Sequence, residues 1–401
     1  MGEGGPMKVL VLTKVPIDPP RDGGSLRVSA IREHLISKGH EVRVISARNN
    51  VITSAQAKKR ISKQIRILSS ALSTFSVSVL KWYSPSVVDQ LVSQAEGFDP
   101  DVVLCEFPQL APYLSLFSAP TIADFHNVES EIVSNYAKTR HGITRVLANL
   151  ESLALQRVER KVASTAAGVA AVSVHDSQQI SNWTALKPVV ASNGVSEEAF
   201  NITCNVASAL APTVVFIGQL GWRPNIDASL WLANEVWPLV LQKIPNAELQ
   251  LIGRTPAIEV IDLARKSNIS VHGDVESVFP FLASASVATA PLWTAGGTRL
   301  KILEALATGT PVIATSRGAL GLEHLNDDIA LSITDDANEF ADKIVSVIRH
   351  SVQPEAVRLS VSNYRWNETL EPLTMMVGNI AAQYSMNKNK KHKALLNPVS
   401  D

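Results

Sequence analysis

Apolar, strand-like runs alternate with amphipathic helical stretches along nearly the whole chain, and this alternation narrows the possible folds more than any other feature. The run MKVLVLT at 7–13 is followed by a helical pattern at 25–39 and by the strand-like HEVRVIS at 40–46. A strand, a helix and a second strand in this order form a parallel βαβ unit. The first half continues with strand-like runs at 101–106, 120–125, 168–173 and 188–192, and with helical stretches near 84–96 and 144–164.

The same alternation begins again after a polar stretch that is rich in small residues. Strand-like runs then lie at 213–218, 247–253, 269–273, 287–292 and 311–316, with helical stretches at about 226–241, 256–267, 298–308, 336–350 and 366–385. We therefore expect an α/β protein with two Rossmann-like, doubly wound domains facing each other across a cleft. The expected parts are a domain at 1–200, a linker at 201–212, a second domain at 213–355, helices at 356–386 and a disordered basic tail at 387–401.

Composition narrows the class of protein further. Apolar residues make up 46% of the 401 residues, which is enough to bury a core in each of two domains. The sequence has no run of about 18 apolar residues and no basic leader before its first apolar run, so neither a membrane span nor a signal peptide is expected. The two cysteines, Cys105 and Cys204, suit a reducing compartment. We therefore expect a cytoplasmic location.

The segment TAGGTRLKILEALATGTPVIATSRG, at 294–318, has the features of an anion site. Gly296 and Gly297 stand in the loop between a strand-like run and a helix. Glycines leave backbone N–H groups open to a ligand, and a helix N-terminus attracts anions. Arg299 and Lys301 add positive charge at a helix end that normally prefers acidic residues. A bound phosphate would resolve this local conflict.

Glu304 lies three residues after Lys301, on the same face of the expected helix. One interpretation is an ion pair between these two side chains at the protein surface. The other is a carboxylate that accepts hydrogen bonds from a ribose diol, one helical turn beyond a phosphate. The residue pattern alone leaves both interpretations open.

Five segments, taken together, resemble the family 4 (group 1) glycosyltransferases with the GT-B fold. They are DGGSLRVSAIREHLISKGHEVRVIS, DFHNVES, VVASNGVSEEAF, FIGQLGWRPNID and GGTRLKILEALATGTPVIATSRGALGLE. The resemblance implies a retaining hexosyltransferase that moves a sugar from a nucleotide-diphosphate donor to a glycan, a lipid-linked acceptor or a small molecule. It favours a UDP-sugar over a GDP-sugar. It also implies that the C-terminal helices cross back to the first domain.

The resemblance assigns donor-binding roles to glycines and to a few side chains. The matching positions are Gly23, Gly24, Gly253, Arg254, Gly273, Val275, Gly296, Gly297, Thr298, Arg299, Leu300 and Glu304. Gly23 and Gly24 would let the diphosphate approach the backbone, although a plain helix start capped by Ser25 is the alternative. In the family, the positions that match Gly253 and the 272–275 loop line the nucleobase pocket.

His126, in the DFHN motif, matches the family's histidine that contacts the transferred sugar. A structural histidine is the alternative interpretation. A retaining reaction of this type needs no protein nucleophile, because the leaving phosphate can accept the acceptor's proton. We therefore do not expect His126 to be a general base.

The burden of catalysis then falls on basic residues that stabilise the leaving diphosphate. The family usually has an Arg and a Lys after the first strand of its second domain, where this chain has Gln219 and Asn225. We expect Arg223, Arg299 and Lys301 to share their role. The catalytic set predicted from the resemblance is therefore His126, Arg223, Arg299, Lys301 and Glu304.

A second departure from the family is Gly296, which stands where the first of two glutamates usually precedes the position of Glu304. It leaves the donor sugar unassigned. No tightly bound metal or cofactor is expected, because no cluster of histidine and carboxylates is apparent in the sequence and cationic side chains can replace a metal.

Charge is balanced overall, with 37 Lys and Arg against 37 Asp and Glu, but the 42–88 stretch has eight basic residues and no acidic one. Within 52–92 apolar residues recur at helical spacing, which fits a helical hairpin packed on its own domain or a peripheral contact with a membrane. Nucleic acid is not an expected partner. Two other functions stay open: a nucleotide-sugar epimerase or hydrolase, and a non-catalytic paralogue that serves as a binding subunit.

Overall fold

The computed structural model describes residues 5–20, 22–47, 74, 76–83, 85–203, 211–293, 300–327 and 329–396; for 85, 86, 94–96 and 389–396 it describes the backbone only. The chain forms two compact units, one of residues 1–192 with 370–401 and one of residues 193–369. Within the described ranges, no helix is long and apolar enough to cross a membrane.

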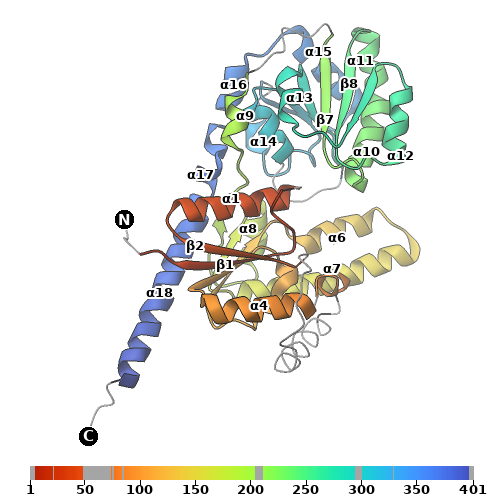
Figure 1. Ribbon diagram of the computed structural model, residues 1–401. Helices are drawn as coiled ribbons and strands as arrows, with labels where there is room; N and C mark the ends of the chain where they lie inside the picture. Colours follow the sequence, from red (N-terminus) through yellow and green to blue (C-terminus); the bar gives the residue numbers. More distant parts are fainter. Residues whose placement is uncertain are drawn as a thin grey trace. The chain divides into compact units, whose positions relative to one another are not determined.

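The first unit is built around a parallel sheet, with six strands among the described residues in the order β2-β1-β3-β4-β5-β6 (Figure 1). Its strands are β1 (Lys8–Thr13), β2 (Glu41–Ser46), β3 (Val102–Cys105), β4 (Thr121–Phe125), β5 (Gly168–Ala171) and β6 (Val189–Val190). The chain leaves β1 toward β2 on one side and continues with β3 on the other. The loops after β1 and β3 therefore lie at the switch point, where open α/β sheets bind ligands.

Helices cover both faces of this sheet, and Figure 1 shows α1 and α4 on opposite sides of β1 and β2. The helices are α1 (Gly23–Ser37), α3 (Val77–Leu80), α4 (Pro85–Phe98), α5 (Ala111–Leu114), α6 (Glu129–Lys138), α7 (Gly142–Thr165), α8 (Val174–Ser181) and α18 (Glu371–Leu396). The last of these returns the chain to the first unit at Leu370. It packs tightly there, since a Cβ atom on Gly168 would lie 2.6 Å from the side chain of Ile380.

The start of α1 differs from the alternative in which Ser25 caps the helix. Asp22, and not Ser25, is the N-cap residue: its side chain accepts a hydrogen bond from Ser25 N at 2.8 Å. The Ser25 hydroxyl in turn accepts from Asp22 N at 2.9 Å, which completes a capping box. The acidic cap placed three residues upstream outcompetes the hydroxyl, so α1 begins at Gly23 and includes both glycines.

The second unit repeats this plan. Its described strands are β7 (Thr213–Ile217), β8 (Glu248–Gly253), β9 (Ile269–Gly273), β10 (Val287–Ala290), β11 (Val312–Ala314) and β12 (Leu331–Ile333), in the parallel order β12-β11-β10-β7-β8-β9. The order reverses between β7 and β10. The loops that follow these two strands are therefore the expected ligand site of this unit.

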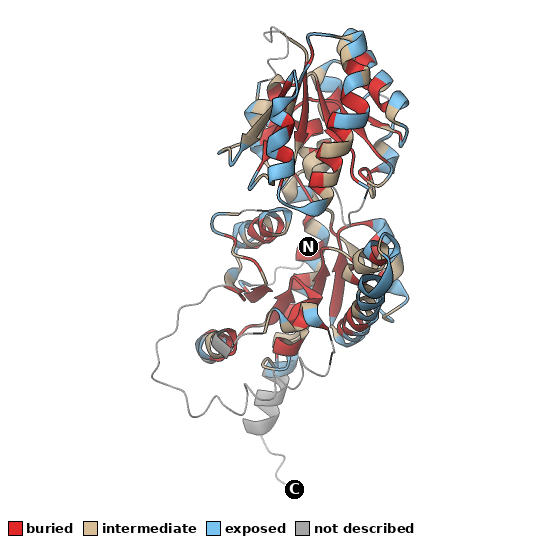
Figure 2. Ribbon diagram, turned by 90° about the vertical axis from the view of Figure 1, so that its right-hand side faces the viewer, coloured by how far each residue is buried: buried red, intermediate tan, exposed pale blue. Residues whose placement is uncertain are grey.

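Alternate side chains of the central strands feed two hydrophobic cores, one on each face of the sheet. Val214 and Phe216 belong to the core that contains Trp237 and Phe340, whereas Val215 packs with the helix that follows β10. The helices are α9 (Glu197–Asn201), α10 (Arg223–Trp231), α11 (Trp237–Lys243), α12 (Ile258–Ile261), α13 (Phe279–Ser284), α14 (Leu300–Ala307), α15 (Ala337–Arg349), α16 (Pro354–Leu359) and α17 (Trp366–Thr369). Figure 2 shows the strands as buried and the outer helix faces as exposed.

Each predicted strand is present, within two residues at either end. The helical stretches fit less closely: a π-helical segment, Leu232–Val236, divides α10 from α11, and 256–267 contains only the short α12 and a 3₁₀ turn. The polar helices α6 and α8, the short α13 and the edge strand β12 are absent from the prediction. Helix α18 continues through Leu396, where a disordered tail is expected.

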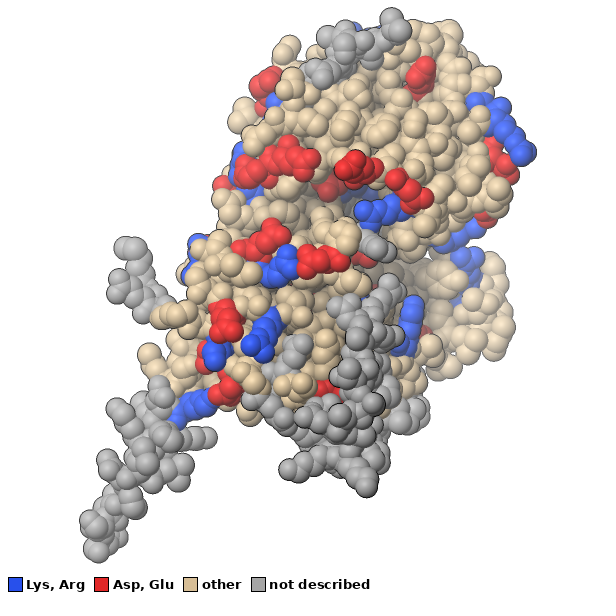
Figure 3. Space-filling view, viewed as in Figure 1, with Lys and Arg blue, Asp and Glu red and all other residues tan. Residues whose placement is uncertain are grey.

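The predicted linker, 201–212, falls within the second unit, and its residues 204–210 lie outside the described residues. Residues 52–73 of the basic segment 52–92 lie outside the described residues as well. On the face shown in Figure 3, the described surface is mostly neither acidic nor basic, and both signs of charge are scattered over it.

Candidate functional site

At the switch point of the second unit, α14 brings Lys301 to the end of β7. Buried residues of α14, including Ile302, Leu303 and Leu306, pack on the sheet. Lys301 Nζ donates to Asn225 Oδ1 at 3.0 Å and lies 4.6 Å from the centre of the Phe216 ring. An aromatic face and a neutral amide oxygen both attract an ammonium group without cancelling its charge.

Asn225 is itself held rigidly. Its side chain is 3% exposed, and its Nδ2 donates to the carbonyl of Gln219 at 2.9 Å. A Cβ atom on Gly218 would lie 2.8 Å from the Asn225 side chain, so the loop after β7 has room for it only because residue 218 is a glycine. The two positions that lack the expected Arg and Lys therefore form a small hydrogen-bonded platform that orients Lys301.

Arg223 stands at the start of α10, and its Nη2 lies 2.6 Å from Asp227 Oδ1. More than half of its side chain is exposed. The ion pair offsets part of its charge and draws the guanidinium along its own helix. Lys301 is therefore the predicted cation that the described residues place most firmly at the end of β7.

Glu304 lies one turn further along α14, where it is partly buried. Burial raises the pKa of its carboxyl to about 7, and the positive charge of Lys301 acts in the opposite direction. The carboxyl is therefore close to half ionised at neutral pH. Hydrogen-bond donors on a ligand would stabilise the ionised form of this carboxyl.

The predicted nucleobase loops come together at the carboxyl edge of β7, β8 and β9. Gly253 pairs with Gly273 across β8 and β9, and Leu220 N donates to the Arg254 carbonyl at 2.9 Å. Gly253 has φ 155°, and a Cβ atom there would lie 1.5 Å from Gly218 O, so only glycine fits. Val275, in the loop after β9, packs against the core beneath α14.

In the second unit, the described members of the predicted donor set lie at the ends of β8 and β9 or on α14, together with the predicted catalytic Lys301: they are Gly253, Arg254, Gly273, Val275, Leu300 and Glu304. The other two described members, Gly23 and Gly24, belong to α1 of the first unit. The remaining predicted positions, Gly296, Gly297, Thr298 and Arg299, lie outside the described residues.

In the first unit, His126 follows β4, the strand beside β3, and is buried. Its Nε2 lies 2.7 Å from Glu106 Oε2, and its ring stacks at a tilt on Phe107, 4.2 Å between centres. A Cβ atom on Gly24 would come within 3.8 Å of His126 Nδ1. The predicted sugar-contacting histidine and the predicted donor glycine are therefore neighbours.

Behind His126 lies a buried ion pair that the sequence does not reveal. Arg27 donates to both oxygens of Asp124, at 2.9 and 3.2 Å, and each side chain is at most 1% exposed. Burial raises the pKa of both Glu106 and Asp124, with Arg27 acting to lower both. Burial, together with the charges of Arg27 and Lys14, holds the pKa of His126 well below its usual value, so the imidazole is neutral.

Glu106, Asp124 and His126 form a cluster of carboxylates and histidine whose nearest ligand atoms lie within 4.8 Å of one another. The expectation that no such cluster exists is therefore wrong. Its members come from the ends of two neighbouring strands, so no sequence spacing shows it. Arg27 engages both oxygens of Asp124, and Glu106 engages His126 Nε2. The second oxygen of Glu106, Oε1, is buried without a hydrogen-bond partner among the described residues.

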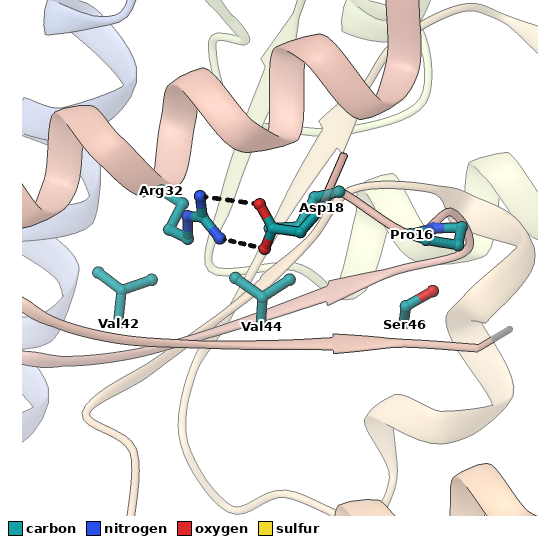
Figure 4. A pocket seen from close by; sticks show the side chains of 7 residues that line it. Pro16, Asp18, Arg32, Val42, Val44 and Ser46 are labelled. Atoms are coloured by element: carbon teal, nitrogen blue, oxygen red, sulfur yellow. Dashed lines mark hydrogen bonds and ion pairs between the residues drawn. The ribbon is translucent and has the colours of Figure 1, made fainter. Parts of the chain in front are cut away.

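The same unit has a cavity of about 300 Å³ between the loop after β1 and strand β2 (Figure 4). Arg32, from α1, pairs with Asp18 at 2.6 Å across its upper side. Val42, Val44 and Ser46 line the opposite side. The lining of the cavity therefore combines an ion pair, a hydroxyl and apolar side chains.

Known proteins resemble both halves of the chain. Residues 21–199 match the family described as Glycosyltransferase Family 4, and residues 211–350 match the family described as Glycosyl transferases group 1. Comparison with curated proteins finds no match.

Solved structures with the same two-unit fold cover nearly the whole chain. A glycosyltransferase from Rickettsia africae is 15% identical over 94% of this chain and 98% of its own, with a TM-score of 0.63. Sucrose-phosphate synthase from Thermosynechococcus elongatus is 17% identical, covering 96% and 100%, with a TM-score of 0.61. Anabaena HepE in complex with UDP and glucose is 16% identical, covering 94% and 99%, with a TM-score of 0.57. The fold is therefore GT-B.

Proposed function

We propose that this chain, a glycosyltransferase with the GT-B fold, transfers a hexose from a UDP-sugar to a hydroxyl acceptor with retention of anomeric configuration. The observation that carries the proposal is the pair Lys301 and Glu304 on α14, next to the end of β7. One side chain offers a fixed positive charge and the other a carboxyl one turn away. A nucleoside diphosphate needs both.

Lys301 is proposed to bind the diphosphate and to stabilise the negative charge that grows on it as the glycosidic bond breaks. Preorganised charge of this kind, in a water-poor site, is worth far more than the same charge in water. The platform of Asn225 and Gln219 supplies the preorganisation. Glu304 is proposed to accept hydrogen bonds from the ribose hydroxyls.

UDP is supported as the nucleotide by the Anabaena HepE structures, which hold UDP with glucose and UDP-glucose. The loops that follow Gly253 and Gly273 are proposed to offer backbone groups for reading a base. No tightly bound metal or cofactor belongs to the proposed mechanism.

His126 is proposed to contact the transferred sugar through Nδ1. Its Nε2 is already held by Glu106, so the ring orientation is fixed before any substrate binds. A neutral imidazole can donate or accept one hydrogen bond without drawing charge away from the reacting centre. The acceptor is proposed to bind to the first unit, where the cavity beside β2 offers Asp18, Arg32 and Ser46 to hydroxyl groups.

The test measures UDP binding and acceptor-dependent UDP release from UDP-glucose, with the anomeric configuration of the product read by NMR. Lys301→Ala and Glu304→Gln should each weaken UDP binding, and Lys301→Ala should lower kcat by about 100-fold or more. Arg265→Ala, a change at an exposed cation of the same unit, serves as the control. UDP release that needs no acceptor would instead identify a hydrolase, and conversion of the donor to another UDP-sugar without UDP release would identify an epimerase. Binding of neither UDP nor GDP would favour a non-catalytic paralogue.

A further inference from the structure

The first half of α7 carries an apolar stripe that the described residues of the first unit leave exposed. Its five members, between 52% and 71% exposed, are Ile143, Val146, Leu147, Leu150 and Leu153. At 100° per residue they fall within about one third of the helix circumference. In the second half of the same helix, by contrast, Leu155, Val158 and Val162 are buried.

The stripe lies on a helical hairpin formed by α6 and α7, which Figure 1 shows side by side, with their connection away from the sheet. The base of the hairpin is fixed firmly: buried Glu159 accepts a hydrogen bond from Ser130 N at 3.2 Å and engages the Ser130 hydroxyl. Ser152 Oγ donates to the Ser130 carbonyl at 2.8 Å. The hairpin therefore presents its stripe on a preorganised element. A contiguous exposed apolar surface of this kind marks an interaction site.

Charge at the tip of the hairpin is of one sign. From 132 to 150 the sequence has Lys138, Arg140 and Arg145 and no acidic residue. Arg140 stacks on the half-exposed ring of Tyr136 at 4.6 Å. The next acidic group, Glu151, faces α3 instead, where it accepts hydrogen bonds from Ser76 Oγ at 2.7 Å and from two backbone N–H groups.

We propose that the tip of the hairpin, residues 132–150 with Leu153, docks on an anionic lipid surface. The apolar stripe would enter the boundary between headgroups and acyl chains, and the cations would contact lipid phosphates, as in interfacial helices. A second copy of the chain is a poorer occupant, because a symmetric contact would oppose the same cations. The segment at 48–73 is a poorer one as well, since its charges, including Lys58, Lys59 and Arg60, have the same sign.

The position of the hairpin near His126 suits the proposed function, and only this argument about the acceptor rests on that function. Helix α6 begins three residues after His126, and Glu129 in its first turn pairs with Lys14 at 3.2 Å. A surface bound to the hairpin would therefore supply lipid-linked acceptors to the unit that contains His126. The docking itself needs no catalysis and is measured without it.

The experiment is sedimentation of the full chain with vesicles of phosphatidylcholine alone, or mixed with phosphatidylglycerol. We expect binding to the mixed vesicles at low salt, and weaker binding as salt is added. The variant Leu147→Asp/Leu150→Asp should abolish binding. Arg140→Glu/Arg145→Glu should weaken it by at least about 25-fold, since each basic residue near the surface contributes about fivefold.

Two matched changes serve as controls: Arg160→Glu on the same helix, outside the tip, and Ile258→Asp at an exposed apolar site of α12. Both should bind vesicles as the wild type does. All variants must keep the wild-type melting temperature and UDP affinity, which separates this proposal from the proposed function. Wild-type protein that ignores mixed vesicles, equal binding by the Leu147→Asp/Leu150→Asp variant, or dimerisation lost in that variant without any vesicle binding would overturn the proposal.

Discussion

The ammonium nitrogen of Lys301 lies 3.0 Å from the amide oxygen of Asn225. This contact joins the helix after β10 to the loop after β7, across the switch point of the second unit. Position 225, where a basic residue is expected, thus holds a neutral partner that orients Lys301 without adding a negative charge beside it. An acidic partner would orient it equally well but neutralise it.

Substitutions at Asn225 should therefore separate orientation from charge. Asn225→Ala removes a hydrogen bond to a charged group, so UDP affinity should fall on the order of tenfold. Asn225→Asp restores a partner but repels the diphosphate, so affinity should fall further. Calorimetry with UDP gives the comparison, and Asn234→Ala, which removes the partner of Lys266 on the surface, is the matched control. Equal affinity in the Ala and Asp variants would show that Lys301 does not meet the diphosphate.

The strand pattern could be predicted from the sequence because it depends on local apolar runs that parallel sheets bury on both faces. Helix details could not be predicted as well. The π-helical segment at 232–236 and the short α12 are not visible as apolar periodicity, and α6 and α8 are only 10 and 8 residues long, too short for periodicity to identify a helix reliably. Gly39, with φ 87°, ends α1 as its glycine pattern predicts.

Site residues that lie on one helix could be predicted from their spacing in the sequence. Site residues that meet only because two strands pair could not. Lys301 and Glu304 share one helix, so their spacing predicts a common face. Glu106 and His126 are 20 residues apart and meet only because β3 and β4 pair. The one signal for Glu106 is an acidic residue directly after an apolar strand, a position at which burial demands a partner.

Binding of UDP should strengthen as pH rises from about 6 to about 8. The pKa of Glu304 is raised to about 7 by burial, so the carboxylate that accepts ribose hydroxyl groups is mostly absent at the lower pH and mostly present at the higher one. The affinity ratio of wild type to Glu304→Gln should grow about tenfold over this range. Taking this ratio cancels the titration of UDP itself. A ratio independent of pH would mean that Glu304 does not titrate in the free enzyme.

Glu159, at the base of the hairpin, should make the folded state less stable as pH rises. Burial raises the pKa of this carboxyl to about 7 from an unfolded value of 4.5, despite hydrogen bonds from Ser130. The folded state thus holds an extra proton between these values, and stability decreases as pH rises through them. Relative to wild type, Glu159→Gln should gain on the order of 3 kcal/mol between pH about 4 and pH about 8, measured by denaturant unfolding.

The matched control for Glu159 is Glu151→Gln on the same helix. Burial acts to raise the pKa of Glu151, but hydrogen bonds from Ser76, Ser78 and Val77 lower it overall. Its contribution to stability is present above the unfolded pKa and is lost as pH falls, so this variant should show the opposite slope. The same slope in both variants would contradict the assignment.

His126 should affect turnover without affecting donor affinity, because the nucleotide groups proposed here belong to the second unit and His126 to the first. His126→Asn should lower kcat for transfer by roughly 100-fold while the Kd for UDP stays within about twofold. Glu106→Gln, which keeps a hydrogen-bonding partner for Nε2, should lose less than Glu106→Ala if the carboxyl acts by positioning the ring. His324→Asn, at a histidine that contacts Tyr364 in the other unit, is the control.

Because the pKa of His126 is held well below its usual value by burial, by Arg27 and by Lys14, the imidazole stays neutral near pH 7. The ratio of wild-type to His126→Asn rates should therefore not change from about pH 6 to about pH 8, and a ratio that rises toward low pH would show instead that the protonated ring is the active form.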